Sequence, residues 1–303
     1  MKVLVATEKP FAAAAVNGIR EIVEGAGHEL ALLEKYTEKS QLIEAVADAD
    51  ALIVRSDKVT EDVIAAAEHL KIIVRAGAGY DNIDLAACTA NNVVVENTPG
   101  QNSNAVAELA IGMMIYMSRN QFTPGTGCEI SGKTLGIIGF GNIGYLIAKK
   151  AVALGMDVLV YTNEIKEKHK RWNATFSLEK LYSTCDFVSV NIPATPFTKK
   201  SVNYNLISKM PKGGCLINTA RKELVCEEGL DKALSERPDL KYATDIAPTN
   251  YAELKEKYGK QIFVTPKKMG AETAEANMNA GLAAARQICE FFVTGSTKFQ
   301  VNK

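Results

Sequence analysis

The stretch Thr134-Leu135-Gly136-Ile137-Ile138-Gly139-Phe140-Gly141-Asn142-Ile143-Gly144 decides the fold that this sequence predicts. Its first five residues have the pattern of a buried strand, the next six read GxGxxG, and a helical pattern follows. That order is typical of a dinucleotide-binding turn, with a Gly-rich turn in another kind of α/β protein as the alternative. In such a turn Gly139 allows the sharp bend, Gly141 lets the backbone approach a pyrophosphate, and Gly144 lets the helix pack closely on the sheet. The helix N-terminus at Asn142-Ile143 then points at the anion.

Short apolar runs of strand length alternate with helical patterns along the whole chain of 303 residues. This alternation predicts an α/β protein with two doubly wound parallel-sheet domains. About 130 residues precede the glycine turn, so we expect a flavodoxin-like substrate domain before a Rossmann nucleotide domain. The strands are expected near residues 2–6, 29–33, 51–54, 71–74, 92–95, 134–138, 157–161, 187–190, 214–218, 241–244 and 262–264.

The last helical pattern, over about 273–293, is long enough to leave the second domain and return to the first. We therefore predict a discontinuous substrate-binding domain of residues 1–98 and 286–303, and an NAD-binding domain of residues 99–285. The two domains are expected to close over a cleft. In the long apolar helix near 103–119, Glu108 is expected to anchor that cleft or to make a buried hydrogen bond.

The composition excludes several classes of function. The 35 basic and 35 acidic residues balance, which argues against nucleic-acid and membrane-surface partners. No apolar run reaches the length of a membrane span, and the N-terminus reads as a strand and not as a signal peptide. Six cysteines without CxxC spacing indicate reduced thiols in a cytoplasmic protein. Neither these cysteines nor the three histidines form a metal-ligand cluster.

The second strand of the nucleotide domain bears on the choice of cofactor. An acidic residue about 20 positions past the glycines commonly binds the adenine ribose. Here Tyr161 ends the strand and Thr162 follows it, ahead of Glu164. Thr162 can still donate to a ribose oxygen, and no arginine stands beside it to hold a 2′-phosphate. We therefore expect NAD as cofactor, while Lys166 and Lys168 leave NADP open.

Three further strand ends carry motifs: Asn218-Thr219-Ala220-Arg221, Thr244-Asp245-Ile246-Ala247-Pro248 and Thr265-Pro266-Lys267-Lys268-Met269-Gly270-Ala271. Together with the GxGxxG turn, and in this order, they resemble the D-isomer-specific 2-hydroxyacid dehydrogenase family over essentially the whole chain. The resemblance implies an NAD-dependent dehydrogenase that works as a homodimer.

The same resemblance assigns roles in the nucleotide domain. Arg221 would bind the substrate carboxylate and polarise the carbonyl oxygen. Asp245 would orient the nicotinamide carboxamide, or else it is a structural turn residue. Thr219 and Ala220 would pass the nicotinamide ring, and the turn Asn191-Ile192-Pro193 would lie on the adenine side.

The first third of the chain narrows the resemblance to the branch of the family that acts on D-3-phosphoglycerate. It contains Val54-Arg55-Ser56-Asp57-Lys58, Val74-Arg75-Ala76-Gly77-Ala78-Gly79-Tyr80 and Asn97-Thr98-Pro99-Gly100-Gln101-Asn102. By resemblance, Arg55 and Arg75 hold the substrate phosphate, and Ser56, Gln101 and Asn102 reach the substrate. The backbone of Gly77, Ala78 and Gly79 would bind its carboxylate.

Elementary chemistry supports that reading independently. Guanidinium groups match phosphate oxygens, so two arginines at strand ends can form a site for a dianion. A Gly-rich turn offers bare backbone N–H groups to an anion. The alternative is two surface arginines near a tight turn.

The sequence departs from the family at the catalytic acid–base pair. The family's histidine follows Thr-Pro, but here Lys268 stands at its place with one residue inserted, and Asn250 stands where the family has its glutamate. Either the enzyme is inactive, or Lys268 transfers the proton, or Lys268 acts only through its charge. Neutral Asn250, the neighbouring Lys267, Arg221 and burial against a nicotinamide ring would all favour the uncharged amine that a base requires. Whether Lys267 or Lys268 carries the proton stays open.

The expected activity is the NAD-dependent oxidation of D-3-phosphoglycerate to 3-phosphohydroxypyruvate, and its reverse, in serine biosynthesis. One alternative is a glyoxylate or hydroxypyruvate reductase, which would not need Arg55 and Arg75. Another is a non-enzymatic NAD(H)-sensing protein of the corepressor kind, which the missing histidine and glutamate favour.

Overall fold

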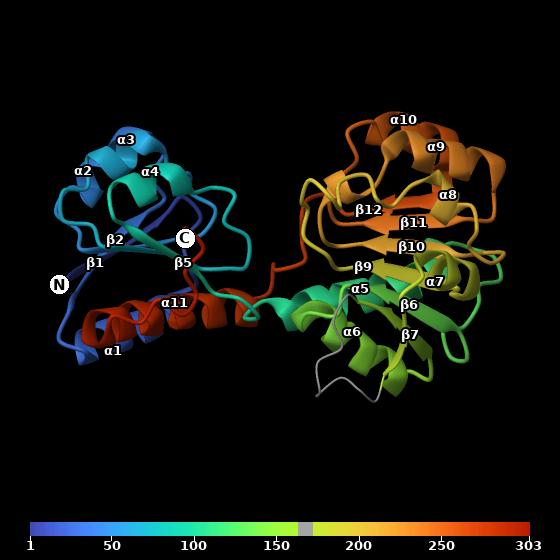
Figure 1. Cartoon of the computed structure of the whole chain (residues 1–303), viewed down its shortest axis with the longest axis horizontal. Helices are drawn as coiled ribbons and strands as arrows, with labels where there is room; N and C mark the ends of the chain where they lie inside the picture. The colour runs from blue at the N-terminus through green and yellow to red at the C-terminus, as the bar shows by residue number, and fades with distance from the viewer. Residues whose placement is uncertain (163–171) are drawn as a thin grey trace. The chain divides into compact units, whose positions relative to one another are not determined.

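The computed structural model describes residues 1–162 and 172–303. The chain forms two compact units (Figure 1). Unit 1 consists of Met1–Asn102 and Glu272–Lys303, and unit 2 of Ser103–Ala271. The substrate-binding domain was expected to resume at 286, but the chain returns to unit 1 at Glu272.

Unit 1 is built on a five-stranded parallel sheet in the order β2-β1-β3-β4-β5, which is the flavodoxin-like order. One apolar core packs under α2, α3 and α4, and a second packs under α1 and α11 on the other face (Figure 1). The elements are β1 (Lys2–Thr7), α1 (Ala13–Gly25), β2 (Glu29–Glu34), α2 (Lys39–Val46), β3 (Ala51–Val54), α3 (Glu61–Ala65), β4 (Ile72–Arg75), α4 (Leu85–Ala90), β5 (Val94–Asn97) and α11 (Ala274–Thr294).

The packing of α11 against α1 explains the shifted domain boundary. Small residues let the two helices approach: a side chain on Gly18 would lie 2.6 Å from Leu282, and one on Gly281 would lie 3.0 Å from Ile19. Ala280, Ala284 and Ile288 are buried in the same core as the strands of unit 1. The whole helix therefore belongs to unit 1, and not only its last turns.

Unit 2 is built on a seven-stranded parallel sheet in the order β12-β11-β10-β9-β6-β7-β8. Its first six strands in chain order follow the Rossmann arrangement, and β12 adds a seventh. The strands are β6 (Thr134–Ile138), β7 (Asp157–Tyr161), β8 (Asn173–Thr175), β9 (Phe187–Val190), β10 (Cys215–Asn218), β11 (Lys241–Thr244) and β12 (Ile262–Val264).

Helices cover both faces of this second sheet. One core packs α5 and α6 on it, and the other packs α7 to α10 on the opposite face. The helices are α5 (Ser103–Ser118), η1 (Asn120–Phe122), α6 (Asn142–Ala153), α7 (Leu178–Thr184), α8 (Tyr204–Ile207), η3 (Lys222–Leu224), α9 (Glu227–Glu236), α10 (Tyr251–Tyr258) and η4 (Gly259–Gln261). Glu108 does not make the buried hydrogen bond that was one of its two expected roles, because it is exposed on α5 and pairs with Lys150 of α6 at 3.1 Å. Its other expected role, in the cleft, stays a prediction.

The strand register brings the carboxyl ends of neighbouring strands to one edge. Ile138 pairs with both Tyr161 and Val190, and Asn218 pairs with both Val190 and Thr244. The residues after β6, β7, β9, β10 and β11 therefore lie side by side, and the turn after β6 sits at the switch point of the sheet, where such folds bind ligands.

Most expected elements lie within two residues of the observed ones. The exception is β8, a strand that the sequence did not suggest. All six cysteines are free thiols. Across residues 1–162 and 172–303, no helix is long and apolar enough to cross a membrane, and no group of three metal-ligating side chains occurs.

Candidate active site

The glycine turn of unit 2 has a specific steric reason for each of its glycines. Gly139 has φ of 88°, and a side chain there would lie 2.7 Å from the carbonyl oxygen of Asn191. A side chain on Gly144 would lie 2.1 Å from the carbonyl oxygen of Gly139. At Gly141, by contrast, no described atom lies within 4 Å of where a side chain would begin. Gly139 and Gly144 are therefore required by the fold, whereas Gly141 leaves open space.

The space beside Gly141 fits the pyrophosphate of a dinucleotide. Gly141 caps α6 without any side chain accepting from the first N–H groups of the helix. Asn142 is exposed and Ile143 partly exposed at that end. Unpaired N–H groups and the positive end of the helix dipole favour an anion. These residues would hold the cofactor's phosphates.

The neighbouring strand ends are tied to this turn. The Gly139 N–H donates to the Tyr161 carbonyl at 3.0 Å, and the Asn191 N–H donates to the Ile138 carbonyl at 2.8 Å. Thr162 and Ile192 are partly exposed and Pro193 is exposed. The structure thus brings Tyr161, Thr162 and Asn191-Ile192-Pro193 to the edge that carries the glycines. Glu164, Lys166 and Lys168 lie outside the described residues, so the preference for NAD over NADP stays a prediction.

The loop after β10 is shaped by a residue that the sequence analysis did not select. The Asn218 side chain accepts from the Ala220 N–H at 3.0 Å and donates to the Arg221 carbonyl at 2.9 Å. The Arg221 guanidinium donates to the Ala220 carbonyl at 2.9 Å. Thr219 is buried, and no described partner bonds its hydroxyl. Asn218 therefore holds the turn that presents Arg221.

Asp245 does more than end a turn. It is buried, and its Oδ2 accepts from the Gly270 N–H at 2.7 Å and the Met269 N–H at 3.1 Å. Burial raises the pKa of Asp245, while those two donors and the charge of Lys268 oppose the rise. No described group bonds its Oδ1. Asp245 thus fixes the backbone just after Lys268 and keeps one acceptor open.

A carboxylate stands near Lys268, although its surroundings were expected to favour the uncharged amine. The protein's own residues leave Lys267 and Lys268 exposed. The Asp245 carboxylate is close enough for the Lys268 charge to lower the pKa of Asp245. Asn250 immediately precedes α10, and its side-chain oxygen is buried without a described partner. A carboxylate therefore does stand near the proposed proton carrier, but it comes from the end of β11 and not from position 250.

In unit 1, the two predicted phosphate-binding arginines come from adjacent strand ends. Val54 pairs with Arg75 in the sheet, so Arg55 directly follows the residue opposite Arg75. The Arg75 Nε donates to the Arg55 carbonyl at 2.8 Å. Gly77 has φ of 152°, and a side chain there would lie 1.4 Å from a guanidinium nitrogen of Arg75. This glycine makes room for the arginine, which is a different reason from the bare N–H groups expected.

The Arg55 side chain is anchored and only 18% exposed. Its guanidinium donates to the Lys9 carbonyl at 3.1 Å and to the Asn277 Oδ1 at 2.6 Å, and it lies 5.3 Å from the Phe11 ring centre. The Glu272 carboxylate is 4.0 Å away. Among the described residues, these hydrogen bonds engage two of the five guanidinium N–H groups.

The other predicted substrate contacts lie on the same edge of unit 1 or on the turn that ends it. Ser56 is exposed, and Ala78 and Gly79 are partly exposed. The Ala78 carbonyl accepts from the Asn97 side chain at 2.7 Å, which ties the glycine turn to the end of β5. Gln101 is exposed and Asn102 is partly exposed at the end of the first segment of unit 1.

Residues 110–266 match the family described as D-isomer specific 2-hydroxyacid dehydrogenase, NAD binding domain. This chain belongs to that family. The match confirms the fold class and NAD as the cofactor. A hydroxypyruvate reductase of Thermotoga maritima is 35% identical over 278 residues, which are 86% of this chain and 90% of that protein.

Two further relatives are named as phosphoglycerate dehydrogenases. The D-3-phosphoglycerate dehydrogenase of Methanocaldococcus jannaschii is 36% identical over 267 residues, covering 82% of this chain and 51% of that one. The solved structure of an NAD⁺-bound 3-phosphoglycerate dehydrogenase from Entamoeba histolytica is 52% identical, with a TM-score of 0.91 over 100% of this chain and 99% of that one. The chain spans about half the length of the curated phosphoglycerate dehydrogenases that it matches.

Proposed function

We propose that this protein oxidises D-3-phosphoglycerate to 3-phosphohydroxypyruvate with NAD, and catalyses the reverse reaction, in serine biosynthesis. The pair Arg55 and Arg75 carries the proposal. They follow adjacent strands, and Arg75 is held to the Arg55 backbone at 2.8 Å. Two arginines fixed at neighbouring strand ends offer guanidinium groups of the kind that suit a phosphate dianion. The relatives named as phosphoglycerate dehydrogenases support the same substrate.

Arg221 binds the substrate carboxylate and polarises the oxygen at the reacting carbon. Asn218 keeps its turn in place through two hydrogen bonds. Bound NAD would supply the hydride acceptor for the oxidation, and NADH the hydride donor for the reduction. Asp245 has an open oxygen suited to the amide N–H of the nicotinamide.

Lys268 is the proton carrier in this proposal. The Asp245 carboxylate nearby favours the charged ammonium, which is the form that donates a proton when the keto acid is reduced. In the oxidation, Lys268 must first lose its proton, and water exclusion by the bound nicotinamide favours that loss. Lys267 is the alternative carrier, and its carbonyl is held by the Thr265 hydroxyl at 2.6 Å.

A second candidate substrate is hydroxypyruvate, which lacks the phosphate. The Thermotoga maritima relative, which this chain covers almost completely, favours it. The two candidates differ in what they require of unit 1, because only a phosphorylated substrate needs the paired arginines.

One assay separates the candidates. NADH and NADPH oxidation would be followed with 3-phosphohydroxypyruvate, hydroxypyruvate and glyoxylate. We expect kcat/KM to favour 3-phosphohydroxypyruvate by about 100-fold or more, because a site built for a charged group rejects an analogue that lacks it. Replacing both arginines, Arg55→Gln with Arg75→Gln, should remove that preference. Arg20→Gln is a matched control, because Arg20 is exposed and pairs only with Glu24 among the described residues.

Two results would contradict the proposal. Equal turnover of hydroxypyruvate and its phosphorylated form, unchanged in the double variant, would favour the reductase. NADH binding without oxidation of any of the three keto acids would favour a sensing role.

We also propose a homodimer located in the cytoplasm. The resemblance to the family supports the dimer, and the reduced cysteines are consistent with the location. Sedimentation equilibrium at micromolar concentration would test the dimer.

A further inference from the structure

Asp57 is a buried carboxylate in unit 1 that the reaction described above does not use. Its residue is 3% exposed. Its Oδ1 accepts from the Glu8 N–H at 2.7 Å and from the Tyr36 hydroxyl at 3.0 Å, and its Oδ2 accepts from the Arg55 N–H at 3.1 Å. A buried charge is expensive unless it is fully hydrogen-bonded, so this arrangement calls for a reason.

The three donors come from the ends of three neighbouring strands. Glu8 follows β1, Tyr36 follows β2 and Arg55 follows β3, and the sheet order places β1 between the other two. Burial and the Asp57 carboxylate raise the pKa of the Tyr36 hydroxyl, so it stays a donor. The carboxylate thus holds together the carboxyl ends of three strands.

The same network reaches both phosphate-binding arginines. The Arg55 peptide that donates to Asp57 through its N–H also accepts the Arg75 Nε through its carbonyl, at 2.8 Å. The Asn82 side chain donates to the Asp57 carbonyl at 2.6 Å from the loop after β4. One residue, Arg55, therefore connects the buried carboxylate to both guanidinium groups.

We propose that Asp57 is a positioning residue for phosphate recognition, which sets the spacing of Arg55 and Arg75 without touching the substrate. The inference rests on the proposed function, because it assigns to the two arginines the phosphate of the substrate. A carboxylate that only stabilised unit 1 would affect every substrate alike, whereas a positioning carboxylate affects the phosphorylated one.

Asp57→Asn is a sharp probe because an amide has only one acceptor oxygen. With that oxygen at the place of Oδ1, the Glu8 N–H keeps its partner and the Arg55 N–H faces an NH₂ group. In the flipped orientation the Arg55 N–H keeps its partner and the Glu8 N–H loses it. Tyr36→Phe is the matched control, because it removes one donor from the same carboxylate and leaves both backbone N–H groups bonded.

The test compares kcat and KM for 3-phosphohydroxypyruvate and hydroxypyruvate, with NADH, in the wild type and both variants. We expect Asp57→Asn to lower the preference for the phosphorylated substrate about tenfold, mainly through its KM, and Tyr36→Phe to change the preference less than about twofold. The inference would be overturned if Asp57→Asn kept the preference, or if it lost activity equally with both substrates. The proposed function would still stand in either case. A wild type without any preference would overturn both.

A second variant covers the case in which Asp57→Asn does not fold. Asn82→Ala removes the side chain that bonds the Asp57 carbonyl, and it leaves the buried carboxylate in place. We expect its KM for 3-phosphohydroxypyruvate to rise by about threefold or more, with the KM for hydroxypyruvate unchanged. An unchanged preference in Asn82→Ala, with Asp57→Asn unfolded, would mean that the network serves stability alone.

Discussion

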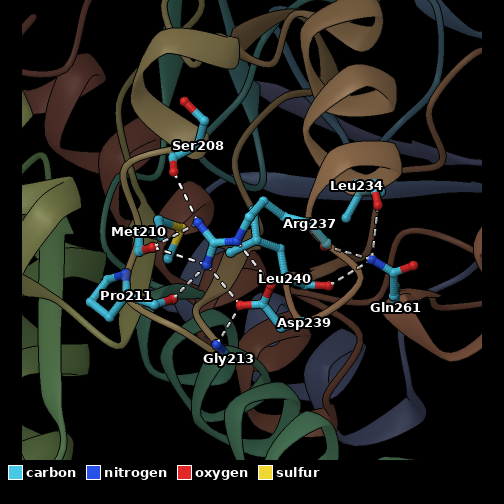
Figure 2. A network of polar contacts seen from close by, with 9 residues as sticks. All are labelled: Ser208, Met210, Pro211, Gly213, Leu234, Arg237, Asp239, Leu240 and Gln261. Carbon is cyan, nitrogen blue, oxygen red and sulfur yellow. Dashed lines mark hydrogen bonds and ion pairs between the residues drawn. The ribbon is translucent and has the colours of Figure 1, made fainter.

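The two edges of the sheet in unit 2 differ in how completely their polar groups are hydrogen-bonded. At the edge where strands begin, Arg237 and Asp239 form a bidentate pair with distances of 2.8 and 2.7 Å (Figure 2). The Arg237 guanidinium also donates to carbonyl groups of the loop before β10, and the Gln261 amide donates to three carbonyls around α9. Those carbonyls belong to Ser208, Met210, Pro211, Leu234, Arg237 and Leu240.

At the edge where strands end, polar atoms are buried without a described partner. They are the Asn191 Oδ1, the Thr219 Oγ1 and the Asp245 Oδ1. The open space beside Gly141 lies at this edge as well. Buried polar groups are normally bonded, so these three, which lie at one edge, are suited to complete their hydrogen bonds with a ligand. One edge thus holds the loops in place, and the other leaves buried polar groups open to a ligand.

The largest effect is expected at the edge where strands begin, which carries Arg237 and Asp239. Arg237→Ala removes the guanidinium that bonds three carbonyls and holds the pKa of Asp239 well below its usual range. We expect the free energy of unfolding to fall by about 3 kcal/mol, because a partly buried carboxylate is left unpaired. Urea titration measures this, and the NADH dissociation constant should stay within about twofold of the wild type.

Lys209→Ala is the control for this variant. Lys209 also pairs with a carboxylate, that of Glu179, but both side chains are well exposed. Its unfolding curve should be indistinguishable from that of the wild type. If Arg237→Ala weakened NADH binding as strongly as it lowers stability, the two edges would not be separate in function.

The second prediction concerns the edge where strands end, called the open edge below, which carries Gly141 and Asp245. Gly141→Ala adds a methyl group where no described atom lies within 4 Å, so the fold should tolerate it. We expect NADH affinity to fall about tenfold or more, roughly 1.4 kcal/mol, because the methyl group occupies the approach of the pyrophosphate. Fluorescence titration with NADH measures the affinity, and thermal unfolding measures the stability.

Gly112→Ala is the matched control for Gly141→Ala. A side chain added at Gly112 would also have no described atom within 4 Å, but Gly112 lies within α5. The substitution should raise stability slightly, because alanine favours a helix over glycine, and leave NADH affinity unchanged. Equal NADH affinity in both variants would mean that the space at Gly141 is not the phosphate site.

The smallest effect concerns pH. Burial raises the pKa of Asp245 above the 3.8 of an exposed carboxyl. Its contribution to stability is therefore full below about pH 3.8 and is lost as the pH rises through the folded-state pKa. Asp245→Asn keeps an oxygen for the Met269 and Gly270 N–H groups and removes the titration.

Urea unfolding of wild type and Asp245→Asn at about pH 4 and about pH 7.5 checks this sign. Between these two pH values, we expect the free energy of unfolding of the wild type to fall by about 1 kcal/mol relative to that of the variant. This is the usual size of the effect for a buried polar group with an open partner position. If the two proteins differed in free energy of unfolding by the same amount at both pH values, burial would not have the role assigned to it.

Much of the fold could be predicted from the sequence because it is encoded locally. Phe187–Val190, for example, is a short and mostly apolar run between turns, and the observed strand has those bounds. The strand Asn173–Thr175 could not be predicted, because its three residues lack an apolar run. The boundary at Glu272 also depends on how α11 packs against α1, which involves residues more than 250 positions apart.

The candidate site was predictable where a motif carries it and not where distant residues meet. The glycines and Arg221 stand in recognisable segments, and the structure brings them to one edge of the sheet. Asn277 is 222 positions from the Arg55 that it bonds, and no local pattern selects it. The Asp245 contacts with residues 269 and 270 likewise depend on the path of a loop after another strand. Asp57 had a local signal, because it is a carboxylate two residues after Arg55.

The central claim is that Lys268, at the open edge, carries the proton. Its most direct test is the pH dependence of kcat for 3-phosphohydroxypyruvate reduction in Lys268→Ala, with Lys267→Ala as the neighbouring control. We predict that Lys268→Ala lowers kcat by about 100-fold or more and removes one limb of the pH profile, while Lys267→Ala changes kcat by less than about threefold. Small and equal losses in both variants, with the wild-type pH profile retained, would contradict it.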